Sequence, residues 1–568
     1  MKILKFGGSS VANADHIQKV ISIVSEQQKT DGDFIVVVSA LGGVTDALID
    51  LANKAMQADA SWSALFGELL AQHEQAICAL IDKNHQQPVL QQIQQIFSQL
   101  QQSLNGIHLL GELSARSLDK VSSVGEQVSA TIIHAALNHQ AIDCQLLDAK
   151  KLIVTDENFG AAEVLIAQSY QQIGDFFGKR SGGFLVGGFM AATQDGTVTT
   201  LGRGGSDYTA ALLGAALNAT SIEIWTDVDG VLTADPRKVR SAFPLTDIRY
   251  EEAAELAHFG AKVIYPKIMK PARLKQIPIQ IKNTFQPQAK GTRISNAAVA
   301  SKFDIQGISS LADVCLLRIR LSDDRTIGEM IAQIFDILSR AGIKILLTTQ
   351  ASHEPSFCIA VASDQARRAK KMVEDTFALA LELQKMQPVT LVEDLSIIAI
   401  VGRQMKGVPG ISGRLFSTLG KNNINVFAIA QGSSELNISA VIHSQDEVPA
   451  LRAIHREFFT ADRNKPNVFL VGTGLIGAAL LEQVSQAGSP IQLCGVANSR
   501  TTAINRNGIA LEQWRTELAA GMAAKDRDFI DEMIRLDLAN TVFVDCTSSD
   551  EITARYGAIL QAGMAIAT

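Results

Sequence analysis

An internal repeat in the middle of the chain constrains its fold more than any other feature. Residues Ala341–Glu354 match residues Asn422–Glu435 at an offset of 81 positions, and the same offset pairs Phe335 with Phe416. Each copy follows the pattern strand, helix, strand, strand, helix, which predicts two tandem βαββαβ modules. Polar residues recur at the same strand end in both copies, which favours a sensing unit over two purely structural modules.

The stretch before the repeat, up to about Lys290, alternates short strands with helices. Apolar runs at Phe34–Val38, Phe184–Val186 and Ser221–Trp225 each precede a glycine-containing loop and a helical pattern. Apolar residues of the glutamine-rich segment Gln86–Gln102 recur at helical spacing and predict an amphipathic helix. The alternation predicts a mostly parallel α/β sheet whose ligands bind at the carboxyl ends of its strands.

The stretch after the repeat begins a third kind of unit. A predicted strand that starts at Asn467 runs directly into the pattern Gly-x-Gly-x-x-Gly, and a helix follows. Strand, glycine loop and helix in this order are typical of a dinucleotide-binding domain, whereas the glycine pattern alone has low specificity. Further strands are predicted at Ile491–Ala497, at Thr541–Asp545 and from Ala565 onward.

Composition and charge argue against several classes of protein. Of 568 residues, 47 % are apolar and 19 % are charged, which is ordinary for a folded multidomain chain. The net charge of −7 predicts no nucleic-acid partner. The sequence contains no run of about 18 apolar residues, and charge and glycines interrupt its first residues, so we expect neither a membrane span nor a signal peptide. The six cysteines form no Cys-x-x-Cys pair, so we expect reduced thiols, a cytoplasmic protein and no structural zinc site, and we name no metal-ligating residue.

The first predicted strand ends in the motif KFGGSS, which starts at Lys5 and precedes a predicted helix at about Val11–Glu26. Glycines at a strand end let backbone amides approach phosphate oxygens, and a helix N-terminus adds partial positive charge. Lys5 would supply a point charge to the same phosphates. The loop lacks the Gly-x-x-x-x-Gly-Lys pattern of a P-loop, and an ordinary tight turn is the alternative interpretation.

A second glycine-rich motif, LGRGGSD, runs from Leu201 to Asp207 and precedes a predicted helix at Tyr208–Leu217. The planar guanidinium of Arg203 suits a carboxylate. Ser206 can cap the helix while the helix N-terminus faces an anion. The alternative is a flexible hairpin followed by a capped helix.

Acidic residues follow the predicted strand that ends at Trp225. Asp227 and Asp229 come directly after it, and Asp235 lies in an Asp-Pro-Arg motif. Carboxylates at the carboxyl end of a parallel strand can bind ribose or Mg²⁺, but Asp-Gly and Asp-Pro are also ordinary turn sequences. Glu126, at another predicted helix start, offers a carboxylate to an ammonium group or to solvent.

In this order the motifs resemble those of the bifunctional aspartate kinase–homoserine dehydrogenase family, in particular its threonine-sensitive branch. The family resemblance implies an amino-acid-kinase-type, mostly parallel α/β sheet domain, two tandem ACT-like modules and an incomplete Rossmann domain. It covers the chain from Met1 to Thr568. The motifs that carry it are KFGGSS, Val38-Ser-Ala with Thr45, Gly125-Glu, LGRGGSD, WTDVDG from Trp225, Asp235-Pro-Arg, Gly260-Ala-Lys, AQGSSE from Ala430 and the Gly472 fingerprint.

The implied reaction is phosphorylation of the β-carboxylate of L-aspartate by ATP with Mg²⁺, the first step toward threonine, methionine and lysine. The resemblance implies catalytic roles for Lys5 and Asp207. Ser9 stands where the family usually has threonine. The positions that match the aspartate site are Thr45, Glu126, Arg203 and Ser206, and those that match the nucleotide site are Lys5, Gly7, Gly8, Ser9, Thr226, Asp227, Arg237 and Lys262.

The resemblance also implies an effector and a second nucleotide. L-threonine would bind at Gln350 and Gln431, with a structural role as the alternative for Gln350. Paired sensing modules imply a homo-oligomer, a dimer or tetramer. Arg500, without an acid nearby, favours NADP(H) over NAD. The expected cofactor-binding residues are Gly472, Gly474, Gly477 and Arg500.

We expect a kinase domain over 1–295, ACT-like modules over 303–385 and 390–460, and a Rossmann domain over 465–568. The family continues with a further nucleotide-domain segment and a dehydrogenase catalytic region, neither of which this sequence contains. We therefore expect a truncated dehydrogenase part without homoserine oxidation. The alternatives are a kinase of another acid such as glutamate, an amino-acid-binding regulatory subunit without turnover, and a working homoserine dehydrogenase.

Overall fold

The chain divides into two compact units, each described by itself. Unit 1 comprises Met1–Val231 and Pro244–Ala300, and unit 2 comprises Leu232–Phe243 and Ser301–Thr568. The computed structural model describes all residues except 179, 261–264, 298–302, 323–326, 351–355, 460–464, 487–490, 525–527 and 539.

Unit 1 is built on an eight-stranded sheet in which every neighbouring pair is parallel except β9 and β10. The expected mostly parallel sheet is therefore confirmed, and β2 has the predicted bounds. In spatial order the strands are β3 (Cys144–Leu147), β4 (Gly183–Gly187), β2 (Phe34–Val38), β1 (Lys2–Phe6), β7 (Ser221–Thr226), β9 (Ile279–Asn283), β10 (Thr292–Ser295) and β8 (Asp247–Arg249). A separate hairpin pairs β5 (Met190–Ala192) with β6 (Val198–Thr200).

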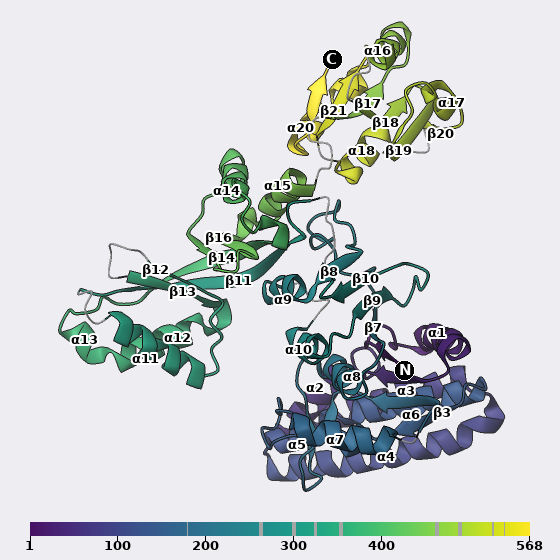
Figure 1. Cartoon of the computed structure of the whole chain (residues 1–568), viewed down its shortest axis with the longest axis vertical. Helices are drawn as coiled ribbons and strands as arrows, with labels where there is room; N and C mark the ends of the chain where they lie inside the picture. The colour runs from purple at the N-terminus through teal and green to yellow at the C-terminus, as the bar shows by residue number, and fades with distance from the viewer. Residues whose placement is uncertain are drawn as a thin grey trace. The chain divides into compact units, whose positions relative to one another are not determined.

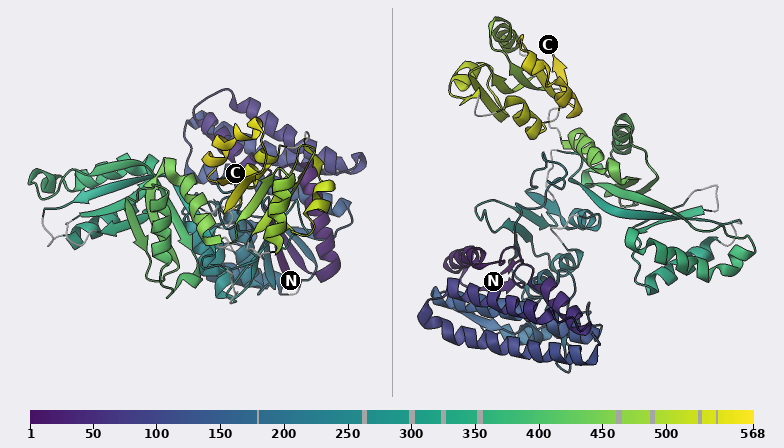
Figure 2. Two further views of the ribbon diagram at one scale, coloured as in Figure 1. Left: turned by 90° about the horizontal axis from the view of Figure 1, so that it is seen from above. Right: turned by 180° about the vertical axis from the view of Figure 1, so that it is seen from behind.

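Helices cover both faces of this sheet (Figure 1). Leu4 and Phe6 of β1 pack into one core with the helices of the first face, and the right-hand view of Figure 2 shows the long violet and blue helices of this layer side by side. Because side chains alternate along a strand, Ile3 and Lys5 face the other layer. The first layer holds α1 (Ala14–Asp31), α2 (Val44–Met56), α3 (Trp62–Leu80), α4 (Lys83–Leu110), α5 (Ala115–Ser122) and α6 (Val124–His139); the second holds α7 (Ile166–Phe177), α8 (Gly205–Ala216) and α10 (Pro266–Leu274), with α9 (Tyr250–His258) beside β8 and β10.

Two predicted helices begin at different residues in the structure. Helix α1 starts at Ala14 rather than near Val11, because the side chain of Asn13 accepts a hydrogen bond from the His16 amide (3.0 Å) and caps the helix there. Helix α8 starts at Gly205, with Gly204 as its N-cap, so Ser206 lies inside the first turn and does not cap it. The predicted amphipathic helix is confirmed as α4.

The repeat in unit 2 forms a six-stranded sheet in the order β12, β13, β11, β14, β16, β15. The offset of 81 residues relates both bounds of β12 to those of β15, and both bounds of β13 to those of β16. This confirms two modules of one fold. Their elements are β11 (Gly307–Arg320), α11 (Ile327–Arg340), β12 (Leu347–Gln350), β13 (Ser356–Ala362), α12 (Ser363–Thr376) and α13 (Ala378–Glu382), then β14 (Thr390–Val401), α14 (Ile411–Lys421), β15 (Ala428–Gln431), β16 (Asn437–His443) and α15 (Glu447–Phe459).

The two long strands β11 and β14 serve both modules (Figure 1). The beginning of β11, Gly307–Leu311, pairs with the end of β14, and the beginning of β14 pairs with the end of β11. Asp313 and Asp394, which are 81 residues apart, both have positive φ (56° and 58°) beside the register shifts between these halves. Each module therefore takes its fourth strand, the last of its six elements, from the chain segment of the other.

The last part of unit 2 is a second α/β sheet. Its strands β18, β17, β21 and β22 are parallel, as expected for a Rossmann domain, and an antiparallel edge of β19 and β20 was not predicted. None of the described helices is long and apolar enough to cross a membrane. The elements are β17 (Asn467–Val471), α16 (Leu475–Gln486), β18 (Gln492–Ala497), β19 (Thr501–Ile509), α17 (Trp514–Ala519), β20 (Met522–Ala523), α18 (Phe529–Leu536), β21 (Thr541–Asp545), α19 (Asp550–Thr553), α20 (Tyr556–Gln561) and β22 (Ala565–Ala567).

Candidate functional site

A cavity of about 520 Å³ in unit 1 is lined by all four residues expected at the aspartate site. The walls come from the end of β1, the loop before α2, helices α5 and α6, and the loop that leads into α8. The predicted residues that line it are Lys5, Gly8, Thr45, Glu126, Arg203, Ser206 and Asp207.

Lys5 and Asp207 form an ion pair inside this cavity. The Nζ atom of Lys5 lies 2.5 Å from Oδ1 of Asp207, and both side chains are largely shielded from solvent. Lys5 reaches α8 because it alternates with Leu4 and Phe6, which point to the opposite face of β1. Asp207 lies in the first turn of α8, where a negative charge is favoured by the helix dipole.

The loop after Lys5 is fixed by hydrogen bonds to neighbouring strands. The Gly7 amide and the Ser10 hydroxyl both donate to the carbonyl oxygen of Trp225, each at 3.1 Å. Ser10 also bonds to the hydroxyl of Thr284 (2.7 Å). A Cβ atom on Gly7 would lie 3.4 Å from Nζ of Lys5, so glycine keeps the space beside the ammonium group open. The loop thus presents a fixed, glycine-lined edge beside a lysine charge.

Glu126 is a buried carboxylate with an unused oxygen. It lies in the first turn of α6 and is 4 % exposed. Among the residues that the structure describes, its Oε2 atom has no hydrogen-bond partner. Burial raises the pKa of Glu126 to about 8, although hydrogen bonds from the Ala40 and Glu126 amides and the charge of Lys5 oppose this shift. Such a carboxylate is suited to pair with a cationic group of a bound ligand.

The loop that carries Arg203 has a conformation that requires glycine. Gly204 has a φ of +71°, and a Cβ atom there would lie 2.6 Å from the ring of Tyr265. Ser206 follows this turn in the sequence, and its side chain is buried, with 7 % of the residue exposed. Arg203 itself is exposed, and within the described part of the chain it has no ion-pair partner. The guanidinium is therefore available to an anionic ligand at the cavity.

The residues expected on the nucleotide side divide between several places. Thr226 and Asp227 stand at the carboxyl end of β7, next to β1 in the sheet, and the Thr226 hydroxyl donates to Asp227 (3.1 Å). Arg237 falls in unit 2, where it pairs with Asp235 at 2.7 Å. Lys262 lies outside the described residues. The structure therefore brings Thr226 and Asp227 to the strand edge that carries Lys5 and assigns Arg237 to the other unit.

Asp119 is a cavity residue that the sequence analysis did not predict. It lies on α5, is 1 % exposed and accepts hydrogen bonds from Gly160 and Thr200. A single acid outside any recognisable motif gives no sequence signal for such a role. That the Asp119 side chain is buried can be recognised only in the folded chain.

In unit 2, Gln350 and Gln431 occupy equivalent positions. They are the last residues of β12 and β15, and both are exposed. The two strands approach each other, with Cα atoms within 8 Å. Residues 351–354, which complete the first copy of the motif, lie outside the described residues.

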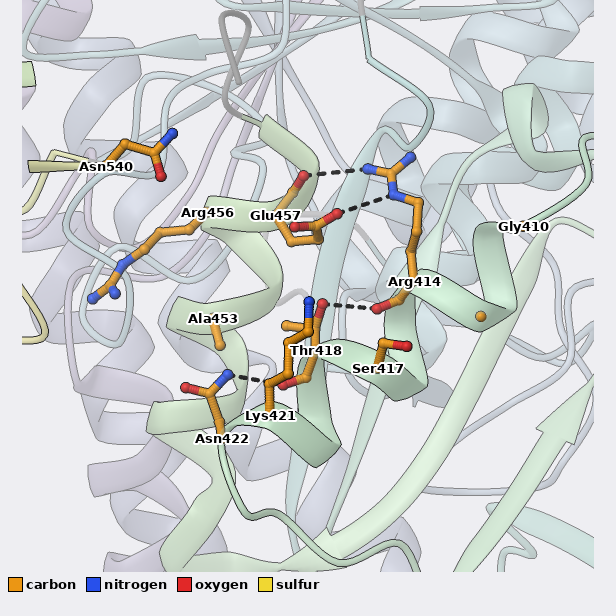
Figure 3. Close-up of a pocket in the computed structure, with 11 residues that line it drawn as sticks. Gly410, Arg414, Ser417, Thr418, Lys421, Asn422, Ala453, Arg456, Glu457 and Asn540 are labelled. Carbon is orange, nitrogen blue, oxygen red and sulfur yellow. Dashed lines mark hydrogen bonds and ion pairs between the residues drawn. The ribbon is translucent and has the colours of Figure 1, made fainter. Parts of the chain in front are cut away.

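A second cavity in unit 2 lies along α14 and α15 (Figure 3). Two of the cations that line it are paired: Arg414 donates through Nε to Glu457 (3.1 Å) and pairs with Asp304, and Arg456 pairs with Asp537 (3.5 Å). Thr418 in turn donates to the carbonyl oxygen of Arg414 (2.7 Å). Because the charge of Arg414 is already compensated within the protein, this cavity is a weaker candidate for an anionic ligand.

The glycine fingerprint lies between β17 and α16, as predicted. Gly472 has a φ of +93°, and a Cβ atom there would lie 2.7 Å from the Cys546 carbonyl oxygen. A Cβ atom on Gly477 would overlap the carbonyl oxygen of Gly472, whereas one on Gly474 would meet nothing within 4 Å. The outer two glycines thus permit close packing and the middle one leaves room for a ligand. Arg500 lies in the turn between β18 and β19, where its amide donates to Asn498 (2.8 Å).

Family profiles match three regions of the chain. The amino acid kinase family matches residues 1–283, an ACT domain matches residues 325–377 and 398–458, and the NAD-binding domain of homoserine dehydrogenase matches residues 472–568.

Whole-chain relatives give the same order of domains. A bifunctional aspartokinase/homoserine dehydrogenase of Haemophilus influenzae is 33 % identical over all of this chain and 71 % of its own length. One from Arabidopsis thaliana is 32 % identical over 99 % of this chain. This chain spans 63 % of the length of that plant relative, which is less than two thirds.

Solved structures of aspartokinases resemble 81 % of this chain. Aspartokinase III of E. coli in complex with aspartate and ADP aligns over 81 % of this chain and all of its own, with 27 % identity and a TM-score of 0.70. The same enzyme in complex with lysine and aspartate aligns with a TM-score of 0.65.

Proposed function

Because the chain belongs to the bifunctional aspartokinase/homoserine dehydrogenase family, we propose that its first unit transfers the γ-phosphoryl group of ATP to the β-carboxylate of L-aspartate. The observation that carries the proposal is the convergence of Lys5, Glu126, Arg203 and Asp207 on one cavity. A carboxylate oxygen of aspartate attacks the γ-phosphorus, the bond from that phosphorus to ADP breaks, and ADP leaves with the electron pair. The products are ADP and 4-phospho-L-aspartate.

The charges in the cavity are complementary to an amino acid with two carboxylates. Arg203 would bind the α-carboxylate through its planar guanidinium. Glu126 would bind the α-ammonium group through its unpartnered oxygen. Thr45 and Ser206 would add hydroxyl groups to the same substrate. These contacts would leave the β-carboxylate as the free nucleophile.

The phosphate side would be formed by the loop after β1. Lys5 would neutralise the transferring phosphate, and the amides of Gly7, Gly8 and Ser9 would face its oxygens. Thr226 and Asp227 would contact the nucleotide from the next strand. We propose the same nucleotide role for Arg237, in unit 2, and for Lys262, outside the described residues.

Mg²⁺ would fit this site because the phosphate oxygens of ATP can supply most of its ligands and the protein need supply only one carboxylate. In sites that bind nucleotides, Mg²⁺ usually takes one or two carboxylates together with phosphate oxygens. Within the described residues no group of three or more His, Cys, Asp or Glu could hold a metal by itself. Asp207 would supply the protein ligand, and the ion would neutralise charge on the phosphates.

No general base is needed for this transfer. The β-carboxylate of aspartate is ionised near pH 7 and is already a nucleophile. Catalysis would therefore come from positioning and from charge neutralisation in the transition state. The ion pair between Lys5 and Asp207 would keep the lysine aimed at the phosphate before the substrate binds.

We propose a nicotinamide nucleotide at the glycine loop after β17, and NADP(H) in particular. The open space at Gly474 would admit the pyrophosphate to the backbone. Arg500 would bind the 2′-phosphate, since the turn that contains it lies at the end of the second parallel strand.

We further propose that the two ACT-like modules bind an amino-acid effector, L-threonine, near Gln350 and Gln431. The support is that these equivalent glutamines end two neighbouring strands. Threonine would inhibit by binding more tightly to a less active state of the enzyme.

A comparison of phosphoryl acceptors tests the kinase proposal. ADP formation from ATP and Mg²⁺ would be measured with aspartate, with glutamate and with neither. We expect rapid turnover with aspartate only. Equal turnover with glutamate would contradict the assigned substrate, and a folded chain without any acceptor-dependent turnover would instead support the regulatory-subunit alternative.

A further inference from the structure

Asp119 is a fully buried carboxylate whose hydrogen-bonding capacity is spent on backbone and hydroxyl donors. The amide of Gly160 donates to both of its oxygens at 3.0 Å. The amide of Thr200 donates to Oδ2 (3.0 Å) and the hydroxyl of Thr200 to Oδ1 (2.7 Å). No ion pair of Asp119 occurs among the residues described. A buried charge held only by such donors is unfavourable unless every one of them is well placed.

The two donor residues support the loop that carries Arg203. Thr200 is the last residue of β6, and Arg203 follows three positions later. Gly160 lies against the same loop, because a Cβ atom on Gly202 would lie 3.2 Å from the Gly160 carbonyl oxygen. The carboxylate of Asp119 therefore joins the two backbone segments on which the turn at Gly202 rests.

The helix that carries Asp119 also leads to Glu126. Helix α5 ends at Ser122, and α6 begins two residues later with Glu126 in its first turn. Asp119, Glu126 and Arg203 all line the same cavity. The hydrogen bonds of Asp119 thus link the helix pair that positions the expected ammonium ligand to the loop that positions the expected carboxylate ligand.

We propose that Asp119 is a positioning residue that fixes Arg203 at the right separation from Glu126 for an α-amino acid. This inference rests on the proposed function of the cavity. Only a charged carboxylate offers acceptors to all these donors at once. An amide in its place would turn an N–H group toward the N–H groups of Gly160 or Thr200.

The test compares Asp119→Asn with a control variant of the hairpin that carries Thr200. Asp195, in the turn between β5 and β6, likewise accepts from Thr197, at its amide (3.3 Å) and hydroxyl (3.0 Å), but does not line the cavity. We expect Asp119→Asn to raise the KM for aspartate by about tenfold to a hundredfold, with the KM for ATP unchanged. Asp195→Asn should leave both constants unchanged.

A double variant shows whether Asp119 acts through Arg203. If it does, adding Asp119→Asn to Arg203→Gln should change the KM for aspartate little further. Full additivity, or a parallel rise in the KM for ATP, would overturn the proposal and indicate a merely structural acid.

Thr200→Val keeps the test decisive if Asp119→Asn fails to fold. This variant removes one donor and retains the β-branched shape, so we expect a smaller rise in the KM for aspartate alone. An unchanged KM in a folded Thr200→Val protein would overturn the inference while wild-type turnover with aspartate upheld the proposed function. Absence of that turnover in the wild type would overturn both.

Discussion

Two glycine-rich loops at strand ends, one after β1 and one after β17, are surrounded very differently. Near the first loop, Lys5 meets charged residues from segments that are more than a hundred positions away. Near the second, the side chains that follow the middle glycine are apolar and exposed, with Leu475 at 91 % and Ile476 at 71 %. Asp545, the acid at the end of β21, accepts hydrogen bonds from the Thr547 amide (2.8 Å) and the Tyr556 hydroxyl (2.7 Å).

The comparison indicates what a glycine loop contributes by itself. Glycines let a ligand approach the backbone, and both loops provide this. Reaction requires charged groups that converge on the ligand, and the described residues show such a convergence at the first loop. This difference supports the proposal of phosphoryl transfer at the first loop and nucleotide binding at the second.

The largest expected effect is that of Lys5→Ala. Loss of the ammonium group removes the charge that would neutralise the transferring phosphate, so turnover should fall by about 10²–10³-fold or more. Steady-state ADP formation measures it. Lys2→Ala, on the same strand but outside the cavity, is the matched control and should retain turnover. Normal turnover of Lys5→Ala would remove the distinction between the two loops.

Glu126→Gln should weaken aspartate binding while the fold is retained. The amide keeps the size of the side chain but carries no negative charge to form an ion pair with an ammonium group, so the KM for aspartate should rise at least about 30-fold. The KM for ATP should change little. Initial rates at varied aspartate and ATP separate the two constants, and an equal rise in both would contradict the assigned role.

The pH dependence of aspartate binding should follow Glu126. Its pKa of about 8 in the free protein means that the carboxyl is mostly protonated at pH 7. Binding of an ammonium group favours the ionised form and releases a proton. The KM for aspartate should thus rise about tenfold per pH unit below pH 8 and level off above it.

Calorimetry in buffers of different ionisation enthalpy measures this proton directly. Binding at pH 7 should release close to one proton in the wild type and none through this site in Glu126→Gln. Equal proton release in both proteins would show that another group titrates.

Gly477→Ala tests the second loop without touching the first. A Cβ atom would overlap the Gly472 carbonyl oxygen, so the loop must distort and NADP(H) binding should be lost. Kinase turnover should stay within about twofold of the wild type, because the side chains assigned to transfer lie in unit 1. Gly557→Ala, in α20 of the same sheet domain and with nothing within 4 Å of the added Cβ atom, is the matched control outside the loop. Fluorescence of bound NADPH measures the difference; undiminished binding would contradict the assignment.

The smallest effect on turnover is expected for Gln431→Ala. Basal activity should be unchanged, since Gln431 ends an edge strand of unit 2. Inhibition by threonine should require a higher concentration. Gln350→Ala is the natural comparison, because the repeat places it at the equivalent position. Unaltered inhibition by threonine in both variants would show that the effector does not bind at these strand ends.

Local patterns allowed much of the fold to be predicted. The apolar run Phe34–Val38 forms β2 with the same bounds, and the repeat offset of 81 recurs in the strands of both modules. The start of α1 was wrong by about three residues because a side-chain cap at Asn13 decides it. Strand β19 was missed because its sequence, Thr501–Ile509, is largely polar and lacks the apolar run of the parallel strands.

The candidate site was predictable where a motif carries it and not elsewhere. Lys5, Arg203 and Asp207 lie in glycine-rich motifs, so sequence pointed to them. Asp119 lies in no motif, and its importance arises from donors 41 and 81 positions away. Segment 232–243, which contains Arg237, groups with unit 2, a tertiary arrangement that no local pattern encodes.

The most direct test of the account is to trap the acyl phosphate. Aspartate, ATP and Mg²⁺ would be incubated with the protein in the presence of hydroxylamine, which converts an acyl phosphate to a hydroxamate. The account predicts aspartate hydroxamate in step with ADP, and neither product above background with Lys5→Ala. ADP without hydroxamate, or no aspartate-dependent ADP from a folded wild-type chain, would contradict it.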